Sequence, residues 1–284
     1  MRRSLRAFAT LAAGVSLSAT GAARDAIRLP LKVLQPIPVI AIEVSGKTID
    51  VGVDTGGKGA LQLTREVLAE VGAVELRGGS DTATNVYGES RHVRHFRLPE
   101  VRVGGRAFSD LIASESPDFK NAPNLPDVVG GLGQEFLHQF VVLVDYPGRV
   151  ISLLPSDVTD SEAQAMGCYG SKAPLEHTDL TALAISRVKL DGAMVRLLWD
   201  TGAAYSTIPT SSATAHGLDV TSEKSGPPVY NSKRLLLGSS DFGPLQFVVL
   251  PVQLPTEFDG LLGYNLLVKH VVCIDYGRGE VQVR

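Results

Sequence analysis

The chain carries one segment twice, and this repeat limits its possible folds more than any other feature of the sequence. Residues 48–64 read TIDVGVDTGGKGALQLT, and residues 194–210 read MVRLLWDTGAAYSTIPT. Both segments lead from apolar residues into Asp-Thr-Gly and then return to apolar residues. A single shared tripeptide is weak evidence, so the rest of the chain decides whether the halves are related.

A second pair of segments follows the first pair in the same order. Residues 128–153 read VVGGLGQEFLHQFVVLVDYPGRVISL, and residues 258–283 read FDGLLGYNLLVKHVVCIDYGRGEVQV. With Gly133 aligned on Gly263, an Asp-Tyr pair begins twelve residues later in both copies. Two segments repeated in order and in register indicate a duplicated lobe.

Both halves have the residue pattern of short β-strands. Runs rich in β-branched residues and bounded by Gly, Pro or Asp occur at residues 39–44, 101–103, 141–144, 271–274 and 281–283. Short helices are predicted at residues 65–71, with Thr64 as the N-cap and Gly72 as the stop, and at the matching residues 211–216. The sequence therefore predicts an all-β protein of two lobes with short helices.

The first 23 residues differ in character from the rest of the chain. A basic start, MRRSLR, precedes an apolar run of small residues that ends at Gly21-Ala22-Ala23. This layout predicts a secretory signal peptide over residues 1–23, with a frayed N-terminal helix as the alternative. We therefore expect a secreted or periplasmic protein. The first lobe would occupy residues 24–155, a polar linker residues 156–173, and the second lobe residues 174–284.

The chain has only two cysteines, Cys168 and Cys273. Export would place them in an oxidising compartment, where cysteines can pair. Two buried free thiols fit the sequence equally well. The sequence alone leaves both possibilities open.

One motif offers a competing interpretation of the first repeat. Residues 52–58 spell G-x-x-x-x-G-K, the pattern of a loop that binds nucleotide phosphates. Residue 59 is Gly, however, where such a loop needs a Ser or Thr for magnesium, and Asp54 would repel the phosphates. The second copy has no Gly-Lys at all. The repeat therefore favours the aspartates as the functional groups.

With both Asp-Thr-Gly copies in view, the chain resembles the aspartic peptidases of the pepsin and retropepsin type, most closely the two-lobed bacterial retropepsin-like proteins. In this family each Asp-Thr-Gly is followed by two hydrophobic residues and a glycine. Leu261-Leu262-Gly263 fits that element fully. In the first half Gly131-Leu132-Gly133 fits with one glycine in place of an apolar residue, and Val128-Val129-Gly130 is a competing register. The repeat favours the former.

The resemblance implies a role for each residue of the two loops. Asp54 and Asp200 would be the catalytic carboxyls. The residues that would hold the loops are Thr55, Gly56, Thr201 and Gly202. The residues that would pack beneath the loops are Leu132, Gly133, Leu262 and Gly263. The threonine hydroxyls would reach across to the opposite loop.

The chemistry explains these residue types without the family. Peptide hydrolysis needs one group that takes a proton from water and another that gives a proton to the substrate. Two carboxyls in contact cannot both ionise easily, so they share one proton and present base and acid together. One aspartate from each half of the chain would supply such a pair.

A further family feature occurs in the first half alone. Tyr87-Gly88 lies between two stretches of strand character, about where pepsin-like enzymes carry a hairpin flap over the substrate. Tyr87 would then cover the bound peptide. An ordinary hairpin turn accounts for the same residues equally well.

Other classes of function find little support. The net charge of −3 gives no basis for nucleic-acid binding, and no later segment approaches the roughly 20 apolar residues of a membrane span. His92 and His95 lack accompanying ligands, so we expect no metal and no cofactor. The repeated aspartates of the Asp-Tyr pairs are interpreted as turn formers, and Trp199 as a core residue.

The sequence thus predicts an aspartic endopeptidase that acts on peptides or proteins. It would be a monomer, because one chain supplies both carboxyls. The alternative is a catalytically silent module that keeps the fold and binds peptides or a partner protein. A glycine-rich loop at residues 56–59 and the altered first glycine element are the features that favour this alternative.

Overall fold

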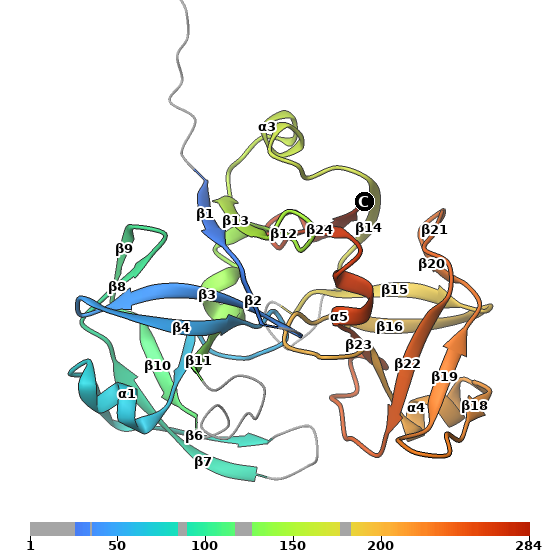
Figure 1. The fold of residues 1–284 in the computed structure, drawn as a ribbon, viewed down its shortest axis with the longest axis horizontal. Helices are drawn as coiled ribbons and strands as arrows, with labels where there is room; N and C mark the ends of the chain where they lie inside the picture. Colours follow the sequence, from blue (N-terminus) through green and yellow to red (C-terminus); the bar gives the residue numbers. More distant parts are fainter. Residues whose placement is uncertain (1–25, 35, 85–89, 117–126, 177–182) are drawn as a thin grey trace, which may run out of the picture.

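The computed structural model describes residues 26–34, 36–84, 90–116, 127–176 and 183–284. Figure 1 shows two lobes side by side, with a third sheet that spans both of them. The predicted signal peptide and the predicted flap residues Tyr87 and Gly88 lie outside the described residues.

Ten strands form the sheet of the first lobe. They are β2 (Lys32–Leu34), β3 (Ile37–Val44), β4 (Lys47–Val53), β5 (Leu61–Leu63), β6 (Val74–Thr84), β7 (Ser90–Arg97), β8 (Glu100–Val103), β9 (Arg106–Ser109), β10 (Ile112–Glu115) and β11 (Val128–Leu132). Their order is β6-β7-β10-β5-β11-β4-β3-β8-β9, and β2 pairs with β3.

Nine strands form the sheet of the second lobe. They are β15 (Ile185–Leu190), β16 (Ala193–Trp199), β17 (Thr207–Pro209), β18 (Val220–Thr221), β19 (Val229–Ser232), β20 (Leu235–Leu237), β21 (Ser240–Asp241), β22 (Leu245–Leu250) and β23 (Gly260–Leu262). The order β18-β19-β22-β17-β23-β16-β15-β20-β21 repeats the first lobe strand for strand, each counterpart being twelve strands later. The duplication deduced from the sequence is therefore present in the topology.

The helices are short and follow the same duplication. They are α1 (Arg65–Glu70), α2 (Gln134–Leu137), α3 (Asp160–Ala165), α4 (Thr210–Ala215) and α5 (Tyr264–Leu267). α1 begins after Thr64, whose side chain accepts a hydrogen bond from the N–H of Val67, as the sequence predicts. α4 is its counterpart, and α2 and α5 each follow the glycine of one hydrophobic-hydrophobic-Gly element.

A six-stranded bridging sheet joins the lobes. Its strands are β1 (Ile27–Pro30), β12 (Phe140–Asp145), β13 (Val150–Pro155), β14 (Ser171–Pro174), β24 (Val271–Asp275) and β25 (Glu280–Val283), in the order β1-β13-β12-β24-β25-β14. The two related hairpins meet where β12 pairs with β24, with Leu143 opposite Cys273 at the centre. A pseudo-twofold axis therefore passes through the middle of this sheet.

Strand alternation gives the bridging sheet two apolar faces. Val142, Val144 and Ile274 belong to the main core shared with the lobes. Their neighbours Val141 and Leu143 belong to a smaller cluster on the outer face. The main core, rather than a mobile hinge, thus connects the two halves.

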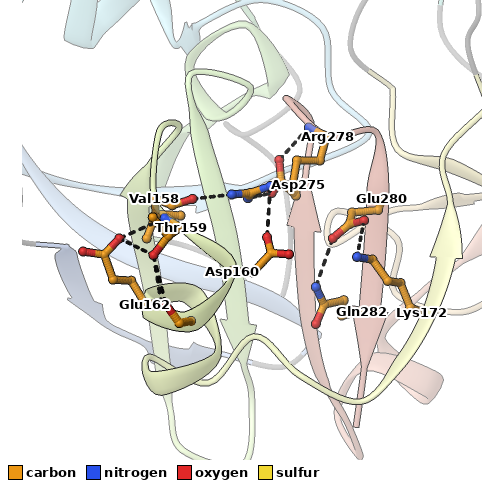
Figure 2. Close-up of polar contacts among 10 residues, drawn as sticks. Val158, Thr159, Asp160, Glu162, Lys172, Asp275, Arg278, Glu280 and Gln282 are labelled. Atoms are coloured by element: carbon orange, nitrogen blue, oxygen red, sulfur yellow. Dashed lines mark hydrogen bonds and ion pairs between the residues drawn. The ribbon is translucent and has the colours of Figure 1, made fainter.

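The expected linker region packs on that outer face. It contains α3, which begins with a capping box between Thr159 and Glu162, and Cys168, which forms a disulfide with Cys273 of β24. The structure thus has the cysteine pair rather than two free thiols. In Figure 2 the guanidinium of Arg278 contacts Asp275, Asp160 and the carbonyl of Val158. These contacts fasten the segment to the last hairpin.

Candidate active site

The two Asp-Thr-Gly loops leave the ends of counterpart strands. β4 ends at Val53 beside Leu132 of β11, and the N–H of Asp54 donates to the carbonyl of Leu132 at 2.9 Å. β16 ends at Trp199 beside Leu262 of β23, and the N–H of Asp200 donates to the carbonyl of Leu262 at 3.0 Å. This register makes Leu132-Gly133 the counterpart of Leu262-Gly263.

The glycines after these leucines lie directly beneath the loops. A Cβ atom on Gly133 would come within 2.5 Å of the Gly59 carbonyl oxygen, and one on Gly263 within 2.7 Å of the Ala203 carbonyl oxygen. No side chain fits at either position. The next residues, Gln134 and Tyr264, each donate a backbone hydrogen bond of 2.9 Å to the loop above.

The two threonines bind the loops to each other in a symmetric way. The Thr55 hydroxyl donates to the carbonyl of Trp199, and the Thr201 hydroxyl donates to the carbonyl of Val53, both at 2.6 Å. Each hydroxyl also accepts from the N–H of the other threonine at 3.0 Å. Both side chains are buried. The four bonds hold the two loops in one fixed relation.

Backbone N–H groups of each loop point at its own carboxyl. Gly56 and Gly57 donate to Oδ1 of Asp54 at 3.0 and 2.8 Å, and Gly202 donates to Oδ1 of Asp200 at 2.8 Å. These donors stabilise the ionised carboxylate.

The glycines also allow the loops to approach the opposite carboxyl. A Cβ on Gly56 would lie 2.6 Å from Cγ of Asp200, and a Cβ on Gly202 would lie 2.6 Å from Oδ1 of Asp54. Any larger residue would displace the partner's carboxyl. Asp54 and Asp200 are 146 positions apart in the sequence, as are Thr55 and Thr201. The two aspartates therefore meet at the pseudo-twofold axis.

The two carboxyls are hydrogen-bonded to each other, and their environment separates their acidities. Burial raises the pKa of Asp54, and its N–H donors and its bond from Asp200 oppose that rise. Burial and the nearby charge of Asp54 raise the pKa of Asp200 well above its usual value. Both carboxyls are thus harder to ionise than a free aspartate. Both residues nevertheless retain partial exposure to solvent.

Two supporting residues are absent from the sequence-based prediction. Gly57 supplies a second donor to Asp54, and a Cβ there would lie 2.5 Å from the other carboxyl oxygen. Ser206 is fully buried, and its hydroxyl accepts from the N–H of Gly263 at 3.0 Å. Its counterpart in the first half is Ala60, whose carbonyl takes that role. A difference between the repeats was the signal that could have identified Ser206.

The other residues considered from the sequence take structural positions. Trp199 is buried, and its indole N–H donates to Ser186 at 3.1 Å. His95 contacts Asp81 and Ser114, each at 3.2 Å. Within the described part of the chain no group of three or more His, Cys, Asp or Glu side chains could hold a metal ion. No helix among those residues is long and apolar enough to cross a membrane.

Comparisons with known proteins bear on both the second lobe and the whole fold. Residues 186–266, which include Asp200 and Gly263, match the family model described as aspartyl protease. A comparison with curated protein sequences gives no significant match. The crystal structure of an aspartic proteinase from Irpex lacteus matches with a TM-score of 0.58 and 11% identity, over 91% of this chain and 97% of that chain.

At this identity the structural match shows the fold alone, and the family model covers the second lobe. The predicted all-β, two-lobed fold is confirmed. The chain has the fold of a pepsin-like aspartic proteinase and an aspartyl protease signature in its second half, and together these findings support an aspartic peptidase of the pepsin and retropepsin type.

Proposed function

We propose that this protein is an aspartic endopeptidase that hydrolyses peptide bonds with a water molecule activated between Asp54 and Asp200. The observation that carries the proposal is the pair of carboxyls that the two crossed loops bring together at the axis. The raised pKa of both carboxyls supports one proton shared between them. Such a pair presents a base and an acid to the same substrate atom. Peptides and proteins are the substrates that this chemistry serves.

We assign the shared proton to Asp200, the carboxyl whose pKa is raised more, and this assignment determines the first step. Ionised Asp54 takes a proton from the water, whose oxygen attacks the carbonyl carbon of the peptide bond. Protonated Asp200 gives its proton to the carbonyl oxygen, which yields a neutral tetrahedral diol. Transfer of the proton on Asp54 to the amide nitrogen then lets the C–N bond break, and a diol hydroxyl returns a proton to Asp200. The pair ends with the single proton with which it began.

The loop contacts support this mechanism by fixing the geometry. The crossed bonds of Thr55 and Thr201 link the main chains of the two loops in both directions. Preorganised groups need no rearrangement as charge moves during the reaction. The glycine elements beneath the loops oppose their separation.

Two further proposals concern the state of the protein. The Cys168–Cys273 disulfide fits an oxidising compartment, which supports a secreted or periplasmic location. Because one chain supplies both carboxyls, the site is complete in a monomer. Tyr87 and Gly88 remain our proposed flap residues on the basis of their sequence position.

A digest of an unfractionated peptide library tests the function. We expect the folded protein to generate new peptide termini in mildly acidic buffer, and Asp54→Asn or Asp200→Asn to abolish cleavage. Asp241→Asn is the matched control, because Asp241 is an exposed aspartate of β21 paired with Arg234. Absence of cleavage from pH 3 to pH 8 by the folded wild-type protein would favour the catalytically silent binding module instead.

A further inference from the structure

Two tyrosines occupy counterpart positions beneath the carboxyl pair and have no part in the chemistry above. Tyr146 follows β12, and Tyr276 follows β24. Tyr146 belongs to the main core, and Tyr276 packs against it, so both rings project from the face of the bridging sheet that meets the lobes. The Cys273 disulfide lies on the opposite face.

The aspartate before each tyrosine fixes its direction. The Asp145 carboxylate accepts the N–H of Gly148 at 2.6 Å, and the Asp275 carboxylate accepts the N–H of Arg278 at 2.9 Å. Figure 2 shows the additional ion pair between Asp275 and the Arg278 guanidinium. The repeated Asp-Tyr pairs are therefore turns that aim a tyrosine inward.

The tyrosine hydroxyls are buried polar groups without a partner. Neither the Tyr146 hydroxyl nor the Tyr276 hydroxyl has a hydrogen-bond partner among the described residues, and the same holds for Oε1 of Gln134. The three are the only buried side-chain atoms with this property in the described part of the chain. A buried donor that loses water without gaining a partner destabilises the fold, so such groups in native proteins commonly bind internal water.

The surroundings place these hydroxyls close to the supports of the loops. The Tyr146 ring packs edge-on against Tyr264, with ring centroids 5.6 Å apart. Tyr264 begins α5 and donates its N–H to Ala203 in the loop of Asp200. The pseudo-twofold axis relates Tyr146 to Tyr276 and Tyr264 to Gln134, which donates to Gly57 in the loop of Asp54. Each tyrosine of one half thus lies under the loop of the other half.

The electrostatic contacts follow the same crossed arrangement. Besides burial, the charge of Asp200 raises the pKa of Tyr146, and the charge of Asp54 raises the pKa of Tyr276. Both hydroxyls therefore stay protonated and remain donors. Tyr264 also faces Tyr146 and adds to the rise in the pKa of Tyr146.

We propose that Tyr146 and Tyr276 are positioning residues, each holding one buried water molecule that relays a hydrogen bond from the tyrosine hydroxyl to the carboxyl loop of the opposite half. The water accepts from the hydroxyl and donates toward Asp200 on one side and Asp54 on the other. On the Tyr276 side, Oε1 of Gln134 takes the second hydrogen of the water. Each relay stabilises the ionised form of the carboxyl that it reaches. The catalytic meaning of the inference rests on the proposed function, but the relay itself does not.

Carboxyl titration tests the relay without any substrate. In protein labelled with ¹³C-aspartate, the Asp54 and Asp200 carboxyl resonances are assigned from the single Asn variants and followed against pH. Loss of a donor disfavours the ionised form of the carboxyl that it reaches. Tyr276→Phe should therefore raise the first apparent pKa of the pair, at which Asp54 ionises, and Tyr146→Phe should raise the second, at which Asp200 ionises. We expect a shift of about 0.5–1 unit, a roughly three- to tenfold weaker acid.

Tyr230→Phe is the matched control. Tyr230 is also buried, and its hydroxyl donates to Asp191 at 2.9 Å, but it lies in β19 of the second lobe. Tyr230→Phe should lower the stability of the protein without shifting the apparent pKa values of the carboxyl pair. Shifts in both Phe variants no larger than in this control would overturn the relay and leave the tyrosines a packing role.

A crystal structure of the wild-type protein provides a second, variant-free test. We expect one ordered water within about 3 Å of each tyrosine hydroxyl, bonded onward to the opposite loop. Both hydroxyls packed against apolar atoms, with no ordered water beside them, would contradict the proposal. A protein that shows the titration shift but cleaves no peptide ends the proposed function and keeps the relay. A protein that cleaves peptides without the titration shift overturns the relay and keeps the proposed function.

Discussion

At the scale of single residues, the sequence predicted the groups that have a repeated counterpart. Asp54, Asp200 and their threonines were identified because each half carries the same tripeptide, and the structure brings all four together. Gly57 and Ser206 were missed because the prediction selected only residues that the two halves share, and the halves differ at these positions. The raised pKa of the two carboxyls also could not be predicted, since it depends on burial and on three-dimensional contacts.

The crossed threonine bonds predict a specific loss of stability. Thr201→Val removes the hydroxyl that serves both the N–H of Thr55 and the carbonyl of Val53, leaving two buried polar groups unpaired. We expect about 2–4 kcal/mol lower free energy of unfolding in urea titrations. Thr201→Ser keeps the hydroxyl and should lose less than half as much. Equal losses in both variants would assign the effect to packing rather than to the bonds.

The absence of a hydroxyl after each Asp-Thr-Gly predicts the pH dependence. The residues there are Gly57 and Ala203, and burial raises the pKa of both carboxyls. We expect optimal cleavage at about pH 4–6, above the range set by an unperturbed aspartate. Ala203→Ser adds a donor that favours ionised Asp200, so the alkaline limb of the rate profile, at which Asp200 loses its proton, should move to lower pH. An alkaline limb that moves upward in this variant would show that other groups set the acidity.

At the scale of elements, the helix-cap signals in the sequence predicted one helix and were overlooked for another. The helix predicted at residues 65–71 is α1, capped by Thr64 as expected. α3 was missed inside the expected linker, although Thr159 and Glu162 have the spacing of a capping box that the sequence displays. The sheet order could not be predicted, because pairing between β12 and β24 joins segments that only the folded chain brings together.

The elements beneath the loops predict a sharp sensitivity to a single methyl group. A Cβ on Gly263 would lie 2.6 Å from the backbone carbon of Tyr205. Gly263→Ala should therefore shift the loop of Asp200 and cost about 1–3 kcal/mol of stability, measured by urea titration, with a larger loss in cleavage. Gly277→Ala is the control, because the nearest atom to a Cβ there is 3.5 Å away. If both variants behave alike, the close packing beneath the loop has no special role.

At the scale of the whole molecule, the duplication determines the site. Two counterpart lobes share the bridging sheet (Figure 1). This arrangement brings one carboxyl from each half to the axis. The disulfide fastens the segment between the lobes to the strand at that axis, closing a loop of 105 residues. Replacing both cysteines with serine should lower the free energy of unfolding by about 2–4 kcal/mol, measured in urea, with cleavage kept below the new transition. Unchanged stability would mean that the outer cluster holds the segment without the bond.

The central claim is that the two halves form one carboxyl pair with a single shared proton. A carboxyl whose pKa is raised on folding binds more protons in the native state, so its contribution to stability is lost as pH rises from 3.8 through the folded pKa. The wild-type protein should lose up to about 1.4 kcal/mol per pH unit in that window through Asp200. Asp200→Asn removes the neighbouring charge and should lack this loss.

The most direct test is therefore the free energy of unfolding of the wild-type protein and of Asp200→Asn, measured in urea at intervals from pH 3.5 to pH 7.5. The account predicts that the variant gains stability relative to wild type as pH rises. Asp191 has a pKa lowered by hydrogen bonds from Lys233 and Tyr230, so its protonation changes at and below 3.8, the acid end of this range. Asp191→Asn should therefore differ from wild type by a nearly constant amount above about pH 5, and it serves as the control. A difference between wild type and Asp200→Asn that stays constant with pH would contradict the shared proton.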